Sequence, residues 1–154
     1  MEAIIMNKLL TSLILMASLL VGPVVSAAGV ATKEEAQAMA VKAAEYLTAN
    51  GAEKAFLAFE AKDGPWHDRD LYVMVLDAKG VLRAHGNNAG LTGKSMLALK
   101  DVDGKPFIQS IVDVSDRGWI DYKWQNPVTK AVEPKTSYEI RVGEYVVGVG
   151  AYVQ

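Results

Sequence analysis

The spacing of apolar residues changes near residue 70, and this change constrains the fold more than any other feature of the chain. Before it, residues 36–50 are rich in alanine and straight-chain side chains, which favour helix. Thr32 and Glu35 have the spacing of a capping box, which marks a helix start. Gly51 is a natural C-terminal stop. We therefore predict a long helix over residues 32–50 and a shorter one over residues 52–61.

After residue 70 the apolar residues come in short runs of strand length. Strands are predicted over residues 70–77, 81–86, 118–125, 135–142 and 144–153. Gly143 is expected to form a tight hairpin between the last two strands. A short helical piece over residues 94–100 and a helix over residues 105–116 are predicted between the second and third strands. Strands joined by hairpins form antiparallel sheets, so the expected fold is α+β: a sheet of about five strands with the long N-terminal helix on one face.

The first residues of the chain have the pattern of a secretory signal peptide. Residues 9–21 are an almost unbroken apolar run, preceded by Lys8 and followed by small residues at 26–28. The run is short for a membrane-spanning helix, which needs about 20 residues. We predict a signal peptide over residues 1–27 and a single soluble domain over residues 28–154, located in the periplasm or secreted. Retention of the apolar run as an N-terminal membrane anchor is the alternative.

The composition argues against several classes of function. The chain contains no cysteine, so it has no thiolate ligand for a metal and no cysteine nucleophile. Its net charge is −2 and it has no basic cluster, which argues against a nucleic acid partner. His67 and His85 lack the spacing of a zinc site. A phosphate-binding loop would need glycine where the chain has Asn88. We expect no cofactor and no metal.

One predicted strand carries an unusual set of half-polar aromatic residues. Alternation along residues 118–125 places Tyr122 and Trp124 on the same face, where they offer apolar walls and hydrogen-bond donors. Lys135, at the start of the next predicted strand, would attract a carboxylate. His85 could add a donor at the end of the second strand. Each residue also has an ordinary alternative: the aromatic residues as core, Lys135 as a solvated edge residue and His85 as a satisfied histidine.

Two features of the other strands bear on the same pocket. Gly148 and Gly150 share one face of the last strand and leave room there, either for a ligand or for close packing of a helix. Tyr72 lies on a strand that is apolar on both faces, so a core position is favoured over a ligand contact. The predicted ligand-binding residues are Tyr72, His85, Tyr122, Trp124 and Lys135.

In their order, the segments of the chain resemble the single Cache domain, the extracytoplasmic relative of the PAS fold. After the long helix come LYVMVLDAKGVLRAHG, LTGKSMLALKDVDGKPF, a helix, GWIDYKWQNP, EPKTSYEI and YVVGVGAYV, which together span about residues 33–153. The resemblance implies a PAS-like sheet and a sensor that binds a small organic acid or amino acid, with Lys135 in the pocket. Such domains usually belong to chemoreceptors and sensor kinases.

Three functions follow from these patterns. The favoured one is an exported, ligand-binding sensory domain. No second span and no signalling module follow, so this domain is expected to be free-standing, with a membrane receptor or a kinase as partner. The first alternative is an interaction subunit without a ligand, forming a homodimer through its N-terminal helix. The second is a hydrolase, which is least favoured because no motif pairs a nucleophile with a base, although Asp113 or Asp121 could act as a base. The domain is therefore not expected to be an enzyme.

Overall fold

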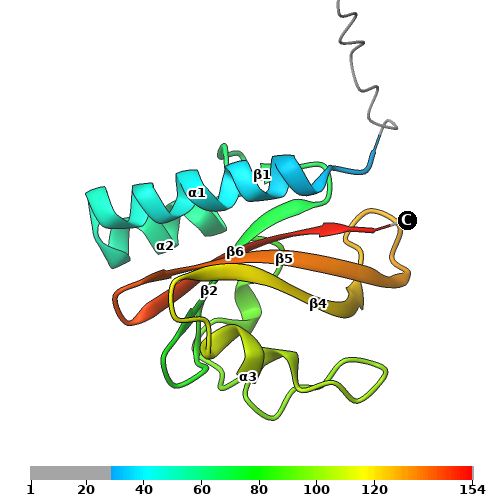
Figure 1. Ribbon diagram of the computed structural model, residues 1–154. Helices are drawn as coiled ribbons and strands as arrows, with labels where there is room; N and C mark the ends of the chain where they lie inside the picture. Colours follow the sequence, from blue (N-terminus) through cyan, green and yellow to red (C-terminus); the bar gives the residue numbers. More distant parts are fainter. Residues whose placement is uncertain (1–28, 154) are drawn as a thin grey trace, which may run out of the picture.

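The computed structural model describes residues 29–153 and contains one antiparallel sheet with helices on both faces (Figure 1). The predicted signal peptide lies outside the described residues. The first two elements of the described residues are helices, α1 (Lys33–Asn50) and α2 (Ala52–Glu60). The predicted capping box is confirmed, because the Glu35 amide donates to Thr32 Oγ1 at 3.2 Å and the Thr32 amide donates to the Glu35 carboxylate at 2.7 Å. Local sequence thus determines where α1 begins.

The strands of the sheet lie in the order β1-β2-β6-β5-β4, and β3 also pairs with β2. Their bounds are β1 (His67–Asp68), β2 (Leu71–Asp77), β3 (Leu82–His85), β4 (Arg117–Gln125), β5 (Val132–Val142) and β6 (Tyr145–Tyr152). All of these pairings are antiparallel. Gly143 has a φ of 59° in the β5–β6 turn, so the predicted hairpin is confirmed. The predicted α+β, PAS-like antiparallel sheet is confirmed as well.

The predicted helical piece over residues 94–100 is wrong. A short 3-10 helix, η1 (Ala89–Leu91), is followed by turns, and the next residues pair with the β2–β3 region. The Leu82 amide donates to the carbonyl of Lys94 at 3.0 Å, and the Met96 amide donates to the carbonyl of Gly80 at 2.8 Å. Backbone groups used in this pairing are not available to a helix, so tertiary contact overrides local propensity here.

Two other elements differ from their predicted bounds by more than one residue at an end. The third helix, α3 (Phe107–Val112), is shorter than residues 105–116, since Pro106 is its N-cap and a turn begins at Asp113. Strand β5 begins at Val132 rather than at residue 135. The fully buried Asn126 tightens the preceding turn by accepting a hydrogen bond from the Val128 amide at 2.8 Å, so β4 and β5 pair up to their ends.

The two faces of the sheet bury separate sets of apolar side chains. Helices α1 and α2 cover one face, and α3 with the loops around it covers the other (Figure 1). The larger core lies under α1 and α2 and includes Phe59, whose ring centroid lies 5.0 Å from that of Trp66. The smaller core lies under α3 and includes Phe107 and Tyr122. The second core is the one that borders the candidate site.

Candidate functional site

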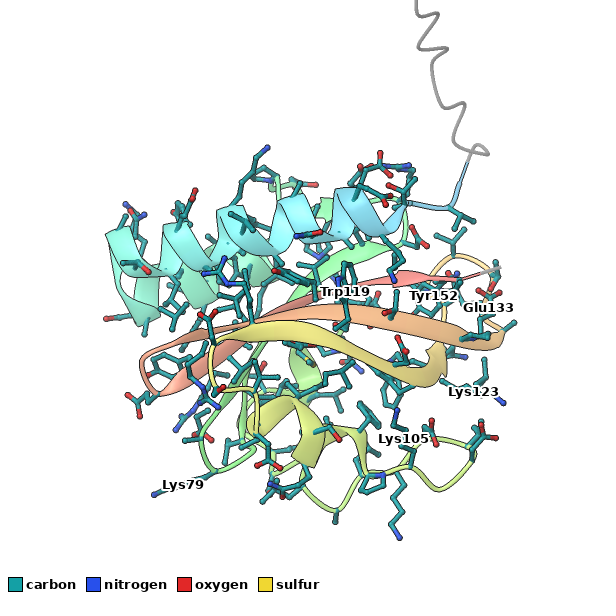
Figure 2. All side chains as sticks on the ribbon, viewed as in Figure 1. Lys79, Lys105, Trp119, Lys123, Glu133 and Tyr152 are labelled. Atoms are coloured by element: carbon teal, nitrogen blue, oxygen red, sulfur yellow. The ribbon has the colours of Figure 1, made fainter. Side chains whose placement is uncertain are left out.

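The register of β4 against β5 decides which aromatic residues belong to the site. Trp119 pairs with Tyr138 and the two rings lie 4.9 Å apart, on the face that α1 covers (Figure 2). Tyr122 pairs with Lys135 on the opposite face. There the Tyr122 ring stacks on Phe107 of α3 with centroids 4.2 Å apart. The strand thus divides its aromatic residues between core packing and the site, as the predicted alternation requires.

All five residues that were predicted to bind a ligand line one enclosed cavity between the sheet and α3. The cavity has a volume of about 20 Å³ and is lined by Tyr72, His85, Tyr122, Trp124 and Lys135 together with mainly apolar neighbours. Leu91, Met96 and Leu99 line it from the segment that precedes α3. This volume holds about one water molecule. The structure brings the five residues together, and their role in binding stays a prediction.

Among residues 29–153, Lys135 is the only lysine, arginine, aspartate or glutamate in the cavity wall. Its side chain is buried, with 3% of the residue exposed. The ammonium donates to the hydroxyl of Tyr72 at 2.8 Å and to that of Tyr152 at 3.4 Å, and it lies 4.1 Å from the Tyr72 ring centroid. None of the salt bridges formed by the described residues includes Lys135. A buried cation without a counter-ion is costly, and an anion beside it would relieve that cost.

The ammonium lies beside two tyrosine hydroxyls, those of Tyr72 and Tyr152, which also interact with each other. Tyr152 donates its own hydrogen to the carbonyl of Gln125 at 2.7 Å. Tyr72 accepts from Lys135, and a hydroxyl that accepts keeps its hydrogen for donation. Lys135 and Tyr72 can therefore both donate to the same carboxylate.

His85 is placed to act as a neutral donor. Burial, reinforced by the charge of Lys135, lowers the pKa of His85 to about 4, so its ring is neutral at pH 7. The Asn88 amide donates to His85 Nδ1 at 3.0 Å. The hydrogen of the neutral ring then resides on Nε2. The ring lies against Tyr72, with centroids 4.8 Å apart, on the same side of the cavity.

The two glycines of β6 make room for charged side chains of β5. Lys135 crosses β6 over Gly150, where a Cβ atom would collide with Lys135 Cε. The Glu139 carboxyl group occupies the corresponding space over Gly148. The sequence left two alternatives for these glycines, room for a ligand or close packing of a helix. Close packing of a helix is wrong, because side chains of β5 lie over both glycines.

Replacing Gly150 with alanine is expected to weaken the binding of an anionic ligand by about tenfold. The added methyl group would displace the Lys135 ammonium from its alignment with Tyr72. One charge-assisted hydrogen bond is worth about 1.5–3 kcal/mol. The far end of a lysine side chain can move, so the fold should tolerate the added methyl group. Calorimetric titration and thermal unfolding of the same variant measure the two effects. An unchanged affinity would show that the position of the ammonium is unimportant.

Glu139 is the residue that sequence reasoning missed. It is fully buried on the cavity face of β5, where no salt bridge of the described residues includes it and the Ser137 hydroxyl is the neighbour that interacts with its carboxyl group. Burial raises its pKa to about 7, against smaller opposing effects of Ser137 and Lys135. The signal was present in the strand pattern, because Lys135, Ser137 and Glu139 follow one another at every second position and therefore share a face.

The site has one side that approaches solvent. Lys135 and Tyr122 also line an open groove of about 480 Å³ at the β4 edge of the sheet. Asp101, which also lines this groove, accepts hydrogen bonds from the amides of Lys105 at 2.9 Å and Lys123 at 3.1 Å. Figure 2 labels both lysines on this side of the molecule. Lys135 and Tyr122 thus border both the enclosed cavity and the groove.

Within residues 29–153 there is no group of three or more His, Asp or Glu side chains that could hold a metal ion. In the same part of the chain, no helix combines the length and the apolar character needed to cross a membrane. A mainly apolar cavity with a few polar groups lies between the PAS-like sheet and its covering loops, which is the organisation of a sensory ligand-binding domain.

Comparison with known proteins places this chain in a family. The family model of Single Cache domain 2 matches residues 10–154, and the chain therefore belongs to the single Cache domain family. Domains of this family are in general sensory and bind small ligands rather than catalyse reactions. A search of curated proteins gave no match.

Three solved structures that are similar to this chain are chemotaxis or chemosensory proteins. A methyl-accepting chemotaxis protein from Vibrio parahaemolyticus RIMD 2210633 is 25% identical with a TM-score of 0.68, over 79% of this chain and 88% of that chain. The periplasmic sensor domain of a chemotaxis protein is 26% identical with a TM-score of 0.61, over 79% and 90%. A Cache chemosensory domain studied for carboxylic acid recognition is 21% identical with a TM-score of 0.60, over 79% and 88%, and shares the fold.

Proposed function

We propose that this domain is a periplasmic or secreted sensor for a small monocarboxylate, which it binds in the cavity between the sheet and α3. The observation that carries this proposal is the buried ammonium of Lys135, which forms no salt bridge with any carboxylate of the described residues. A ligand carboxylate would accept hydrogen bonds from Lys135, Tyr72 and His85, and charge-assisted bonds of this kind are the strong ones. The alkyl end would lie against apolar residues such as Phe107.

The volume of the cavity limits the size of the ligand. About 20 Å³ is less than even a two-carbon acid needs, so side chains in the cover must move when the acid enters. Met96 is well suited to this movement, since methionine is unbranched and adapts its shape. Acetate and propionate are therefore better candidates than longer or branched acids. The structural relative that recognises carboxylic acid is consistent with this ligand class.

The signal peptide over residues 1–27 is part of this proposal, because a sensor of external acids must be exported. A partner that reads the bound state, such as a membrane receptor or a kinase, stays a prediction. The resemblance to chemotaxis sensor domains supports a role in chemoreception.

Matched pairs of acids and amides test the proposal. Acetate and propionate are expected to raise the melting temperature of the purified protein, because a ligand that binds only the folded state at 100 times its Kd stabilises it by about 2.7 kcal/mol. Acetamide and propionamide have nearly the same shape without the charge and are expected to leave the melting temperature unchanged. Equal shifts with acids and amides, or no shift with either acid, would contradict the proposal and favour the ligand-free interaction subunit.

A further inference from the structure

Glu139 is a second charged group of the candidate site, and it has no role in the binding of a carboxylate described so far. Its carboxyl group lies over Gly148, and Gly148 lines the cavity. Lys135 lies over Gly150, two residues further along the same strand. The charge of Lys135 lowers the pKa of Glu139, so the two groups interact, but no salt bridge joins them.

The groups that surround Glu139 cannot neutralise it directly. On its own strand, Ser137 and Lys135 are the polar neighbours. Tyr122 of β4 and Tyr72 of β2 face the same region, β3 contributes His85, and β6 contributes glycines. Helix α3, which covers this face of the sheet, contributes the buried side chains of Phe107, Ile108 and Ile111, which are all apolar. The only cation on this face of the sheet near Glu139 is therefore Lys135, among the residues that the structure describes.

A bound monocarboxylate changes this balance of charge. In the unliganded site, the charges of Lys135 and an ionised Glu139 sum to zero. When the acid pairs with Lys135, an ionised Glu139 becomes an excess negative charge in an apolar, fully buried position. Burial of an unpaired charge is costly, so the site favours the protonated carboxyl group.

We propose that Glu139 takes up a proton from solvent when a monocarboxylate binds beside Lys135, so that the acid and the proton enter the site together. This inference rests on the proposed function, because it requires a bound anion. A zwitterionic amino acid would have the opposite linkage, since its ammonium group would favour an ionised Glu139. The small volume and apolar lining of the cavity favour an alkyl chain over a second charged group.

The proposal predicts a pH dependence of known sign. Burial holds the pKa of unliganded Glu139 at about 7, so the carboxyl group is protonated at pH 6 and ionised at pH 8. If only the protonated form accepts the anion, affinity falls by about tenfold between pH 6 and pH 8 and nearly one proton is bound with each acid at pH 8. The ligand itself stays ionised over this range, because simple carboxyl groups have pKa values of about 4 to 5.

Calorimetric titration of the wild-type protein with acetate measures both quantities. Titrations at pH 6 and pH 8, each in two buffers with different ionisation enthalpies, give the affinity and the number of protons bound. The Glu139→Gln variant keeps the shape of the side chain without the titration, and it is expected to bind acetate with the same affinity at both pH values. Glu144→Gln, which changes an exposed glutamate of the β5–β6 turn, is expected to behave as wild type.

The outcomes separate this inference from the proposed function. Acetate binding without proton uptake, or with proton uptake that persists in Glu139→Gln, would overturn the inference and leave the carboxylate site intact. Binding of glycine that strengthens with rising pH would also overturn it and assign Glu139 to an ammonium group. If neither acetate nor propionate binds at any pH, both proposals fail. The wild-type proton count requires no variant, so the test stands even if Glu139→Gln does not fold.

Discussion

Replacing Lys135 with methionine is expected to weaken the binding of acetate by about thirtyfold or more. Removing one partner of a buried, hydrogen-bonded charge pair costs about 2–5 kcal/mol, and each 1.4 kcal/mol is about a factor of ten in affinity. In this protein the loss includes the contact of the ammonium with the carboxylate and the alignment of the Tyr72 hydroxyl, which lies 2.8 Å from Lys135 Nζ. Calorimetric titration of the variant measures the loss.

The same substitution is expected to have a different effect on stability. Lys135 is buried without a salt bridge, so replacing it with an apolar side chain of similar length removes a desolvated charge. The free energy of unfolding of the ligand-free protein should therefore stay the same or rise. Lys79→Met, which changes an exposed lysine in the β2–β3 turn, is the matched control and should alter neither quantity. An affinity for acetate within threefold of wild type would rule out Lys135 as the anion-binding residue.

The Glu139→Gln variant is expected to become more stable than wild type as the pH rises, with the difference growing by about 3 kcal/mol between pH 4.5 and pH 8. Burial raises the pKa of Glu139 from an unfolded value of 4.5 to about 7. Between these two values the folded state keeps a proton that the unfolded state has lost. Wild-type stability from this group is therefore complete below pH 4.5 and is lost as the pH rises to 7.

Urea unfolding of both proteins at several pH values measures this difference. Glutamine is neutral at every pH, so the two proteins should be nearest in stability at pH 4.5 and should diverge above it. Glu144→Gln, at an exposed position, should follow the wild-type profile throughout. A constant difference between wild type and Glu139→Gln across the range would mean that the carboxyl group has an ordinary pKa and is not desolvated.

The stability and binding predictions for Glu139 depend on the same physical cause but can fail separately. A desolvated carboxyl group affects the unfolding profile whether or not a ligand exists. Its coupling to acetate requires in addition that the anion binds within reach of its charge. If the unfolding profile agrees with the prediction but acetate binds without proton uptake, the anion binds farther from Glu139 than Lys135 does.

Local sequence was enough to predict the elements whose causes are local. The capping box of Thr32 and Glu35 determines the start of α1, and the alternation of apolar residues determines which side chains of β4 share a face. These rules depend on residues three or four positions apart, or on every second residue. They also placed Tyr122 and Trp124 on one face and Trp119 on the other, and the structure agrees.

Tertiary structure alone decided the features that depend on partners distant in the sequence. Residues 94–100 are not helical because the backbone of Lys94 and Met96 pairs with residues of the β2–β3 region. The burial of Glu139 requires both its place in the centre of the sheet, beside Gly148 of β6, and the cover provided by α3. A strand pattern shows which face a side chain takes, but the register against a neighbouring strand decides what lies opposite it. For this reason the sequence predicted a cation beside aromatic residues, and only the packed sheet placed a second, unpaired charge at the same cavity.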